Sequence, residues 1–142
     1  MQDTLPIHFA PLQGYTEAIY RNAHDAFFGG VDTYYTPFVR LEKGNFRRRD
    51  VRGIEPENNG VTHLIPQLIA SSAEKAEVIL SLFIEKGYQE VDINLGCPFP
   101  LLAKRHNGSG ILPYPEEVKA LLSIVTRYPQ ISFSVKMRLG WE

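Results

Sequence analysis

Five short apolar runs alternate with amphipathic segments, and this alternation restricts the fold more than any other feature of the chain. Apolar and β-branched runs predict strands over residues 7–12, 31–37, 62–69, 90–95 and 131–139. Helical spacing predicts helices over 17–28, from 71 to Gly87, and from Pro115 onward. Strands joined by helices pair in parallel through right-handed crossovers. The expected fold is therefore α/β: a doubly wound open sheet or part of a (β/α)8 barrel.

Local signals predict where the helices begin and which faces they bury. Thr16 with Glu17 is a predicted N-cap, and the run Ser71-Ser72-Ala73-Glu74 is typical of a capping box. The second helix is expected to bury Ala76, Ile79, Leu80 and Phe83, and the third Val118, Leu121, Leu122 and Val125. Residues 40–60 have weak periodicity, and we expect an irregular segment with at most a short helix.

Length and composition limit the size and class of the protein. A chain of 142 residues with 44% hydrophobic content forms one core, whereas a complete barrel needs about 250 residues. If it is part of a barrel, the chain can hold only about five of the eight β/α units. The net charge of −1 argues against binding nucleic acid by bulk charge. No run of ~18 apolar residues and no signal peptide is evident, which predicts a cytoplasmic protein without a membrane span.

Polar side chains lie near the carboxyl ends of the last three predicted strands. Alternation places them on one face, which a barrel would enclose. They are Gln67, Asp92, Asn94, Lys136 and Arg138. Buried polar groups need partners, so we expect these groups either to pair with one another, for example Asp92 with Lys136, or to contact a ligand.

Cys97 is the only cysteine, and it follows the fourth predicted strand in the run Asn-Leu-Gly-Cys-Pro. One cysteine forms no internal disulfide, and with four scattered histidines it predicts no metal site. The thiol is either a buried apolar group or a reactive one.

Five segments of the chain together resemble the tRNA-dihydrouridine synthase family. They occur in the family's order and span nearly the whole chain. They are Ala10-Pro11-Leu12-Gln13-Gly14-Tyr15-Thr16, Gln67-Leu68, Asp92-Ile93-Asn94-Leu95-Gly96-Cys97-Pro98, Lys104 with Gly108-Ser109-Gly110-Ile111-Leu112, and Val135-Lys136-Met137-Arg138-Leu139-Gly140-Trp141. The third and fifth are the specific ones. The resemblance implies an incomplete TIM (β/α)8 barrel and an FMN enzyme that uses NADPH to reduce uridine in tRNA.

The resemblance also implies roles for particular residues. Cys97 matches the acid that protonates C5 of the uracil, and Asn94 and Arg138 match residues near the substrate. Gln67 and Lys136 match residues that hydrogen-bond the flavin ring. The segment Pro11, Leu12 and Gln13 matches the one that packs under it, although the family more often has an acidic residue or alanine at 13 and valine at 15.

Basic and aromatic side chains near these motifs are candidates for contact with tRNA. Lys104 and Arg105 lie in the loop after Cys97 and are expected to hold phosphates, while Tyr15 or Phe99 could pack near the base. The run Arg47-Arg48-Arg49 with Arg52 is a weaker candidate, because charge runs are usually solvated surface. His106 is expected to be an ordinary loop residue.

The resemblance covers the N-terminal portion of the family's catalytic barrel, residues 1–142. The family's later barrel strands, its phosphate-binding loops and its helical tRNA-binding domain match nothing in this sequence, so we expect the isolated chain to be inactive and to self-associate through exposed barrel edges. Two alternatives stay open: another FMN barrel oxidoreductase of the dihydroorotate dehydrogenase kind, and a non-catalytic fragment that binds RNA or a partner chain.

Overall fold

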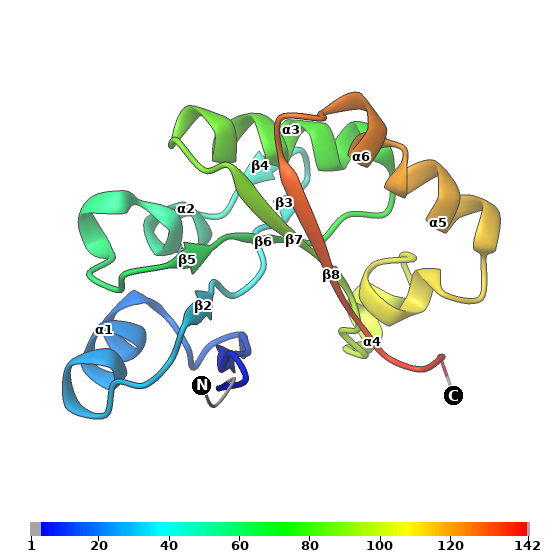
Figure 1. Cartoon of the computed structure of the whole chain (residues 1–142). Helices are drawn as coiled ribbons and strands as arrows, with labels where there is room; N and C mark the ends of the chain where they lie inside the picture. The colour runs from blue at the N-terminus through cyan, green and yellow to red at the C-terminus, as the bar shows by residue number, and fades with distance from the viewer. Residues whose placement is uncertain (1–3, 142) are drawn as a thin grey trace.

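Apart from one short hairpin, the strands are parallel and lie side by side in chain order. The computed structural model describes residues 4–141. Its elements are β1 (His8–Phe9), α1 (Ala18–Phe27), β2 (Thr33–Tyr35), β3 (Leu41–Glu42), β4 (Asn45–Phe46), α2 (Arg48–Ile54), η1 (Pro56–Asn58), β5 (Leu64–Ile65), β6 (Gln67–Leu68), α3 (Ala73–Glu85), β7 (Glu90–Leu95), α4 (Pro100–Ala103), η2 (Gly108–Ile111), α5 (Pro115–Leu122), α6 (Ile124–Arg127) and β8 (Ser132–Met137). Figure 1 shows β6, β7 and β8 near the centre, with α1 and α2 at one end and α5 at the other.

The order of the strands decides between the two expected α/β folds. One sheet has the order β1-β2-β5 and another β6-β7-β8, and a parallel bridge from Val39 to Leu68 connects the second strand region to β6. A doubly wound sheet reverses its strand order at a switch point. The described strands never reverse, so this is an α/β arrangement of parallel sheets like part of a TIM barrel.

The predicted strand over 62–69 is interrupted at Pro66, which separates β5 from β6. Proline has no backbone N–H, although the Pro66 carbonyl still accepts a hydrogen bond from the Asp92 N–H at 3.0 Å. The N–H of Gln67 then turns to the Thr36 hydroxyl at 3.0 Å. Prediction of one continuous strand was therefore wrong, and the break leaves Gln67 paired with β7.

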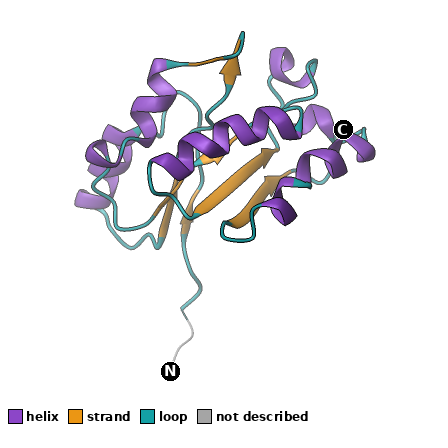
Figure 2. Ribbon diagram, turned by 90° about the horizontal axis from the view of Figure 1, so that it is seen from above, coloured by secondary structure: helices purple, strands orange, loops and turns teal. Residues whose placement is uncertain are grey.

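Apolar side chains between α3 and the second sheet form the main core. The predicted stripe of α3 is confirmed, because Ala76, Ile79, Leu80 and Phe83 are all fully buried. Val91, Ile93 and Leu95 of β7 pack in the same cluster. Figure 2 shows α3 alongside these strands. This packing fixes the position of β7, whose carboxyl end leads to Cys97.

Residues 40–60 are more regular than predicted. They contain the antiparallel hairpin β3–β4 and then α2 and η1. Its two-residue loop, Lys43 and Gly44, has φ angles of 51° and 78°. Both angles are positive, as in the tight turns that suit hairpins, so Lys43 occupies a conformation that non-glycine residues rarely adopt. Sequence analysis did not predict the turn, because Asn, Asp or Gly and not lysine is typical of its first position.

Three helix-end predictions were wrong in detail. The Thr16 hydroxyl does not cap α1 but accepts from the Leu12 N–H at 2.8 Å. Ser72, not Ser71, is the N-cap of α3 and accepts from the Lys75 N–H. The third helix stops at Leu122 and restarts at Ile124. This offset buries Ile124 and leaves Val125 39% exposed.

The expectation of a buried polar row was only partly right. Gln67, Asp92 and Asn94 are buried, but Lys136 and Arg138 are exposed. Lys136 lies on β8 and Arg138 just after it, and β8 pairs only with β7 among the described strands. No strand covers its second edge in residues 4–141.

Two searches of the described residues gave no positive result. No helix in residues 4–141 is long and apolar enough to cross a membrane. Within the same range, no three or more His, Cys, Asp or Glu side chains are grouped so that they could hold a metal ion.

Open strand edges lead to a prediction about the isolated chain. Met137, at the end of β8, is 60% exposed next to the unpaired edge, and Leu139, just after the strand, is fully exposed. We predict that the 142-residue chain forms dimers or larger species, because a bare apolar edge is a template for pairing. Met137→Lys should shift light-scattering masses toward the monomer, and Val78→Lys on α3 is the matched control. A parent chain that stays monomeric at every concentration would contradict this.

Candidate active site

Three buried polar side chains form a continuous hydrogen-bonded chain across β6 and β7. The Gln67 Nε2 donates to Asp92 Oδ2 at 2.6 Å, and the Asn94 Nδ2 donates to Gln67 Oε1 at 2.8 Å. Asn94 Oδ1 accepts from the backbone N–H groups of Gly96 at 3.0 Å and Cys97 at 2.9 Å. We call these three residues the amide relay. It connects the middle of the sheet to the turn that carries the thiol.

One carboxylate sets the direction of every hydrogen bond in the amide relay. An ionised Asp92 can only accept, so Gln67 must present its NH₂ to it and its carbonyl oxygen to Asn94. Asn94 then has only its own carbonyl oxygen left for the turn. Ser134, the register partner of Asp92 on β8, donates to the other carboxylate oxygen at 2.7 Å. The polarity of the Cys97 turn therefore depends on Asp92.

Burial and pairing act against each other on Asp92. Burial raises the pKa of the Asp92 carboxyl, and hydrogen bonds from Gln67 and Ser134 and the charge of Lys136 partly oppose that rise. No ion pair joins Asp92 to Lys136 among the described residues, so the pairing considered as an alternative is not formed as a contact. Lys136 acts on the carboxylate through space only.

The loop after Cys97 is clamped by the Gly-Ser-Gly segment. The Ser109 N–H and hydroxyl both donate to the Cys97 carbonyl oxygen at 3.0 Å. Gly108 has a φ of 60°, and a Cβ there would lie 2.6 Å from that same oxygen. A Cβ on Gly110 would lie 2.1 Å from the Ala103 carbonyl oxygen. Only glycines allow this close approach.

Cys97 itself is half-buried and free. Its side chain packs against a small apolar cluster of Phe38, Ile69 and Leu102. The thiol is therefore held on one side by apolar contacts and on the backbone by Asn94 and Ser109. This is a fixed thiol at the carboxyl end of a parallel strand, which is the end that carries chemistry in barrels.

A cavity of about 230 Å³ lies between the first strand region and β8. It is lined by His8, Ala10, Pro11, Tyr35, Asp92, Ser134, Val135 and Lys136. Two predicted cofactor residues, Pro11 and Lys136, therefore share one cavity with the carboxylate of the amide relay. Their elements are far apart in the chain and are brought together only by the curvature of the sheets.

The segment before α1 contributes one unusual atom. The Oε1 of Gln13 is buried and has no hydrogen-bond partner among the described residues. A buried acceptor without a partner is costly unless a ligand supplies the donor. Leu12 is exposed, and its backbone is held by Thr16.

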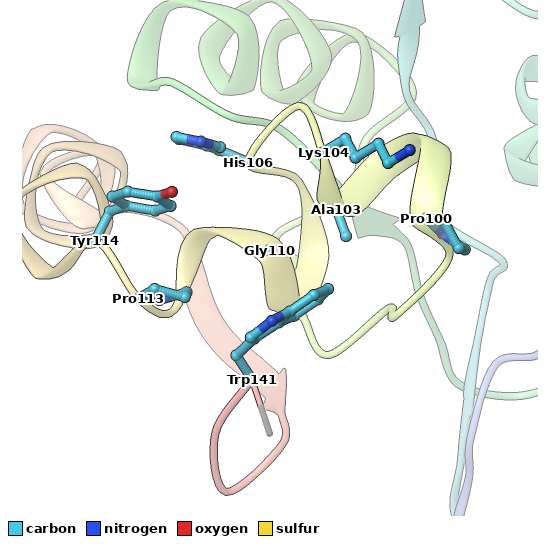
Figure 3. A pocket seen from close by; sticks show the side chains of 8 residues that line it. All are labelled: Pro100, Ala103, Lys104, His106, Gly110, Pro113, Tyr114 and Trp141. Atoms are coloured by element: carbon cyan, nitrogen blue, oxygen red, sulfur yellow. The ribbon is translucent and has the colours of Figure 1, made fainter.

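The remaining predicted substrate residues divide into separate groups. The Arg138 side chain passes over Gly96, where its Cγ would lie 3.5 Å from an added Cβ. Lys104 lines a cavity of about 340 Å³ with Trp141, His106 and Tyr114 (Figure 3). Its neighbour Arg105 lines a different cavity. Lys104 and Arg105, predicted to act together, are therefore directed to different pockets.

Other residues singled out by sequence have structural partners or remain exposed. Arg47 donates to both carboxylate oxygens of Asp50 at 2.8 Å, which accounts for part of the arginine run. Burial raises the pKa of the Asp50 carboxyl, and Arg47 opposes the rise. His106 pairs with Glu117 and stacks on Tyr114. Tyr15 and Phe99 are exposed by 71% and 55%.

Sequence analysis did not assign Ser134 or Ser109 a role at the site. Ser134 could have been found, because it lies opposite Asp92 once the predicted strands are aligned in register. Ser109 carries no such signal, since only the folded loop returns it to Cys97.

Comparison with known proteins identifies one family. A family model described as dihydrouridine synthase matches residues 8–142. The chain is 29% identical over 139 residues to the probable tRNA-dihydrouridine synthase 1 of Synechocystis, covering 94% of the chain and 37% of that protein.

Two proteins named tRNA-dihydrouridine synthase B are also similar. The Klebsiella pneumoniae protein is 33% identical over 54% of the chain and 24% of its own length. The Pasteurella multocida protein is 23% identical over 96% of the chain and 40% of its own length. The chain thus spans well under half the length of these relatives.

The buried carboxylate gives a prediction about pH and stability. The pKa of Asp92 is raised in the folded chain, so folding favours the protonated carboxyl. The contribution of Asp92 to the free energy of unfolding is therefore greatest at low pH, where the carboxyl is protonated in both states, and it falls as pH rises through the folded-state pKa. Asp92→Asn keeps an acceptor for Gln67 and removes the charge. Its free energy of unfolding, relative to the parent, should therefore increase as pH rises.

Two further variants test the assignment. Asp92→Leu leaves the Gln67 amide without its acceptor and should be roughly 1–3 kcal/mol less stable than Asp92→Asn at every pH, because neither variant has the carboxyl. Glu85→Gln, which removes an exposed acid, is the control and should leave the pH profile unchanged. Urea unfolding at a series of pH values measures all three, and parallel profiles for Asp92→Asn and the parent would contradict the prediction.

Proposed function

The chain belongs to the dihydrouridine synthase family, and on that premise we propose that its gene product reduces uridine in tRNA to 5,6-dihydrouridine. The observation that carries the proposal is the amide relay, which fixes the backbone of Cys97 at the strand end of a parallel sheet. A fixed thiol is what protonation of a pyrimidine carbon requires. The five parallel strand regions would form about the first five units of a TIM-barrel wall.

The cavity beside β8 has the features that a flavin ring needs. Pro11 supplies an apolar wall and Lys136 a cation. Gln13, two residues after Pro11, does not line the cavity, but its buried Oε1 has no donor among the described residues. FMN bound there, with NADPH as its reductant, would supply the hydride that reaches C6 of the uracil. Gln67 would contact the ring from the amide relay, and Leu12 would pack below it.

Lys136 would act on the cofactor by charge. Lys136 lines the cavity, where the only acidic side chain is Asp92, and the two residues form no ion pair within 4 Å in the described part of the chain. A reduced flavin carries more negative charge than the oxidised form, so a nearby cation favours reduction.

Cys97 would complete the reduction. As hydride arrives at C6, the double bond of the uracil shifts electron density to C5, and the Cys97 S–H gives its proton to that carbon. The thiolate that remains regains a proton from solvent.

Neighbouring residues would hold the substrate. Arg138, whose side chain crosses Gly96, is next to the turn of the thiol, and Asn94 keeps that turn in place. Tyr15 and Phe99 are exposed enough to pack on an extruded base. Lys104 would contact a phosphate from the cavity shown in Figure 3.

Lys136→Met in the complete gene product tests the electrostatic role. The variant should lower the reduction potential of bound FMN and slow its reduction by NADPH, because the reduced cofactor loses its nearest cation. Potentiometric titration measures the potential, and Lys119→Met on the exposed face of α5 is the control. An unchanged potential would assign Lys136 a structural role.

Cys97→Ala in the complete gene product tests the proton donor. The variant should still bind FMN and oxidise NADPH with oxygen, yet form dihydrouridine on the order of 100-fold or more slowly, the scale expected for one positioned acid. Cys97→Ser, which keeps a weaker acid in place, should recover part of the rate. Dihydrouridine formed at the parent rate by the alanine variant would exclude Cys97 as the acid.

A further inference from the structure

The cavity that Arg105 lines has an unusual concentration of positive charge. It has a volume of about 290 Å³, and its lining includes four cations and no carboxylate. The cations are Arg40, Lys43, Lys75 and Arg105. We call this cavity the basic pocket. A chain with a net charge of −1 has gathered four cations at one place, which bulk composition does not explain.

The four cations come from four different segments. Arg40 follows the second strand region, Lys43 lies in the β3–β4 turn, Lys75 in the first turn of α3, and Arg105 in the loop after α4. Arg40, Lys75 and Arg105 follow the carboxyl ends of parallel strands, where parallel α/β folds bind ligands, and Lys43 lies in the antiparallel hairpin. Folding, not sequence proximity, creates the charge.

Three of the four cations have no acidic partner among residues 4–141. Lys43 and Arg105 form no ion pair among residues 4–141, and Lys75 donates only to the Ser71 hydroxyl at 2.9 Å. Arg40 contacts Glu42 at 3.1 Å, but its Nε is buried and unpartnered in the described chain. A buried guanidinium N–H without an acceptor is costly, and an anionic ligand in the pocket would supply one.

The geometry of the turn supports a binding role. Lys43 has a φ of 51° where a glycine or asparagine would be unstrained. In this conformation the long cationic side chain of Lys43 is part of the lining of the basic pocket.

The basic pocket adjoins the thiol. Ile69 and Leu102 line it, and both also belong to the apolar cluster that Cys97 packs against. Arg105 and Asn107 line it from the same loop that returns Ser109 to the Cys97 carbonyl. A nucleotide extruded toward Cys97 would bring the phosphates of its own strand to this neighbourhood.

We propose that the basic pocket binds neighbouring backbone phosphates of the tRNA substrate and so holds the strand while the target uridine enters the site. The proposal rests on the proposed function. Four cations on separate segments suit a polyanionic strand, whereas one phosphate monoester of a free nucleotide would leave most of that charge unmatched. Lys104, in the neighbouring cavity, lies outside the basic pocket.

The test uses the double variant Lys43→Ala/Lys75→Ala of the complete gene product and an unmodified tRNA transcript as the probe. Both lysines are exposed, so the fold should be retained. Filter binding at a series of salt concentrations should show weaker binding and a slope of log K against log[salt] reduced by about 2, one for each lost phosphate contact. Lys119→Ala/Arg127→Ala removes two exposed cations elsewhere and should leave the slope unchanged.

The outcomes separate the two proposals. If the parent protein forms dihydrouridine but the double variant binds tRNA with the parent affinity and salt slope, only the basic pocket proposal is overturned. If the double variant binds tRNA more weakly but the parent protein forms no dihydrouridine, only the proposed function is overturned. A double variant that loses affinity for NADPH or inorganic phosphate but not for tRNA shows a free-nucleotide site and also overturns the basic pocket proposal.

Discussion

Much of the candidate site depends on one buried acceptor, the carboxylate of Asp92. Because it can only accept hydrogen bonds, it orients Gln67, and Gln67 in turn orients Asn94 toward the Cys97 turn. On its own, each side-chain amide could have its oxygen and nitrogen in either of two orientations. A single charged group in the middle of the sheet removes that freedom. The same carboxylate lines the cavity proposed for the flavin, so cofactor and thiol share one reference point.

This arrangement costs stability. Burying a carboxylate is unfavourable, and hydrogen bonds from Gln67 and Ser134 only partly compensate. An apolar residue at the position would pack without that cost but could not orient an amide. The loop after Cys97 has a similar cost. Gly108 and Gly110 lose more conformational entropy on folding than other residues would, but only glycine allows the close backbone contacts there. Both costs occur around the turn that carries the Cys97 thiol.

Positive charge is distributed in a different way. The arginine run looks like the strongest basic feature of the sequence, yet Arg47 is bound to Asp50 inside the fold. Arg40, Lys43, Lys75 and Arg105 look unremarkable along the chain and meet around one pocket. Charge density in sequence and charge density in space are therefore different quantities. The second one decides where a polyanion is attracted.

The sequence by itself determined the α/β class, the apolar stripe of α3 and the polar residues of β7, because periodicity reports which face of an element is buried. It also identified Cys97 and its turn through a specific motif. It could not predict the break at Pro66, the hairpin turn at Lys43, the exposure of Lys136 or the division of Lys104 from Arg105. Those features were decided by tertiary structure, since they depend on which strands are neighbours and on how a loop returns to them. Local patterns contain no information about such long-range contacts.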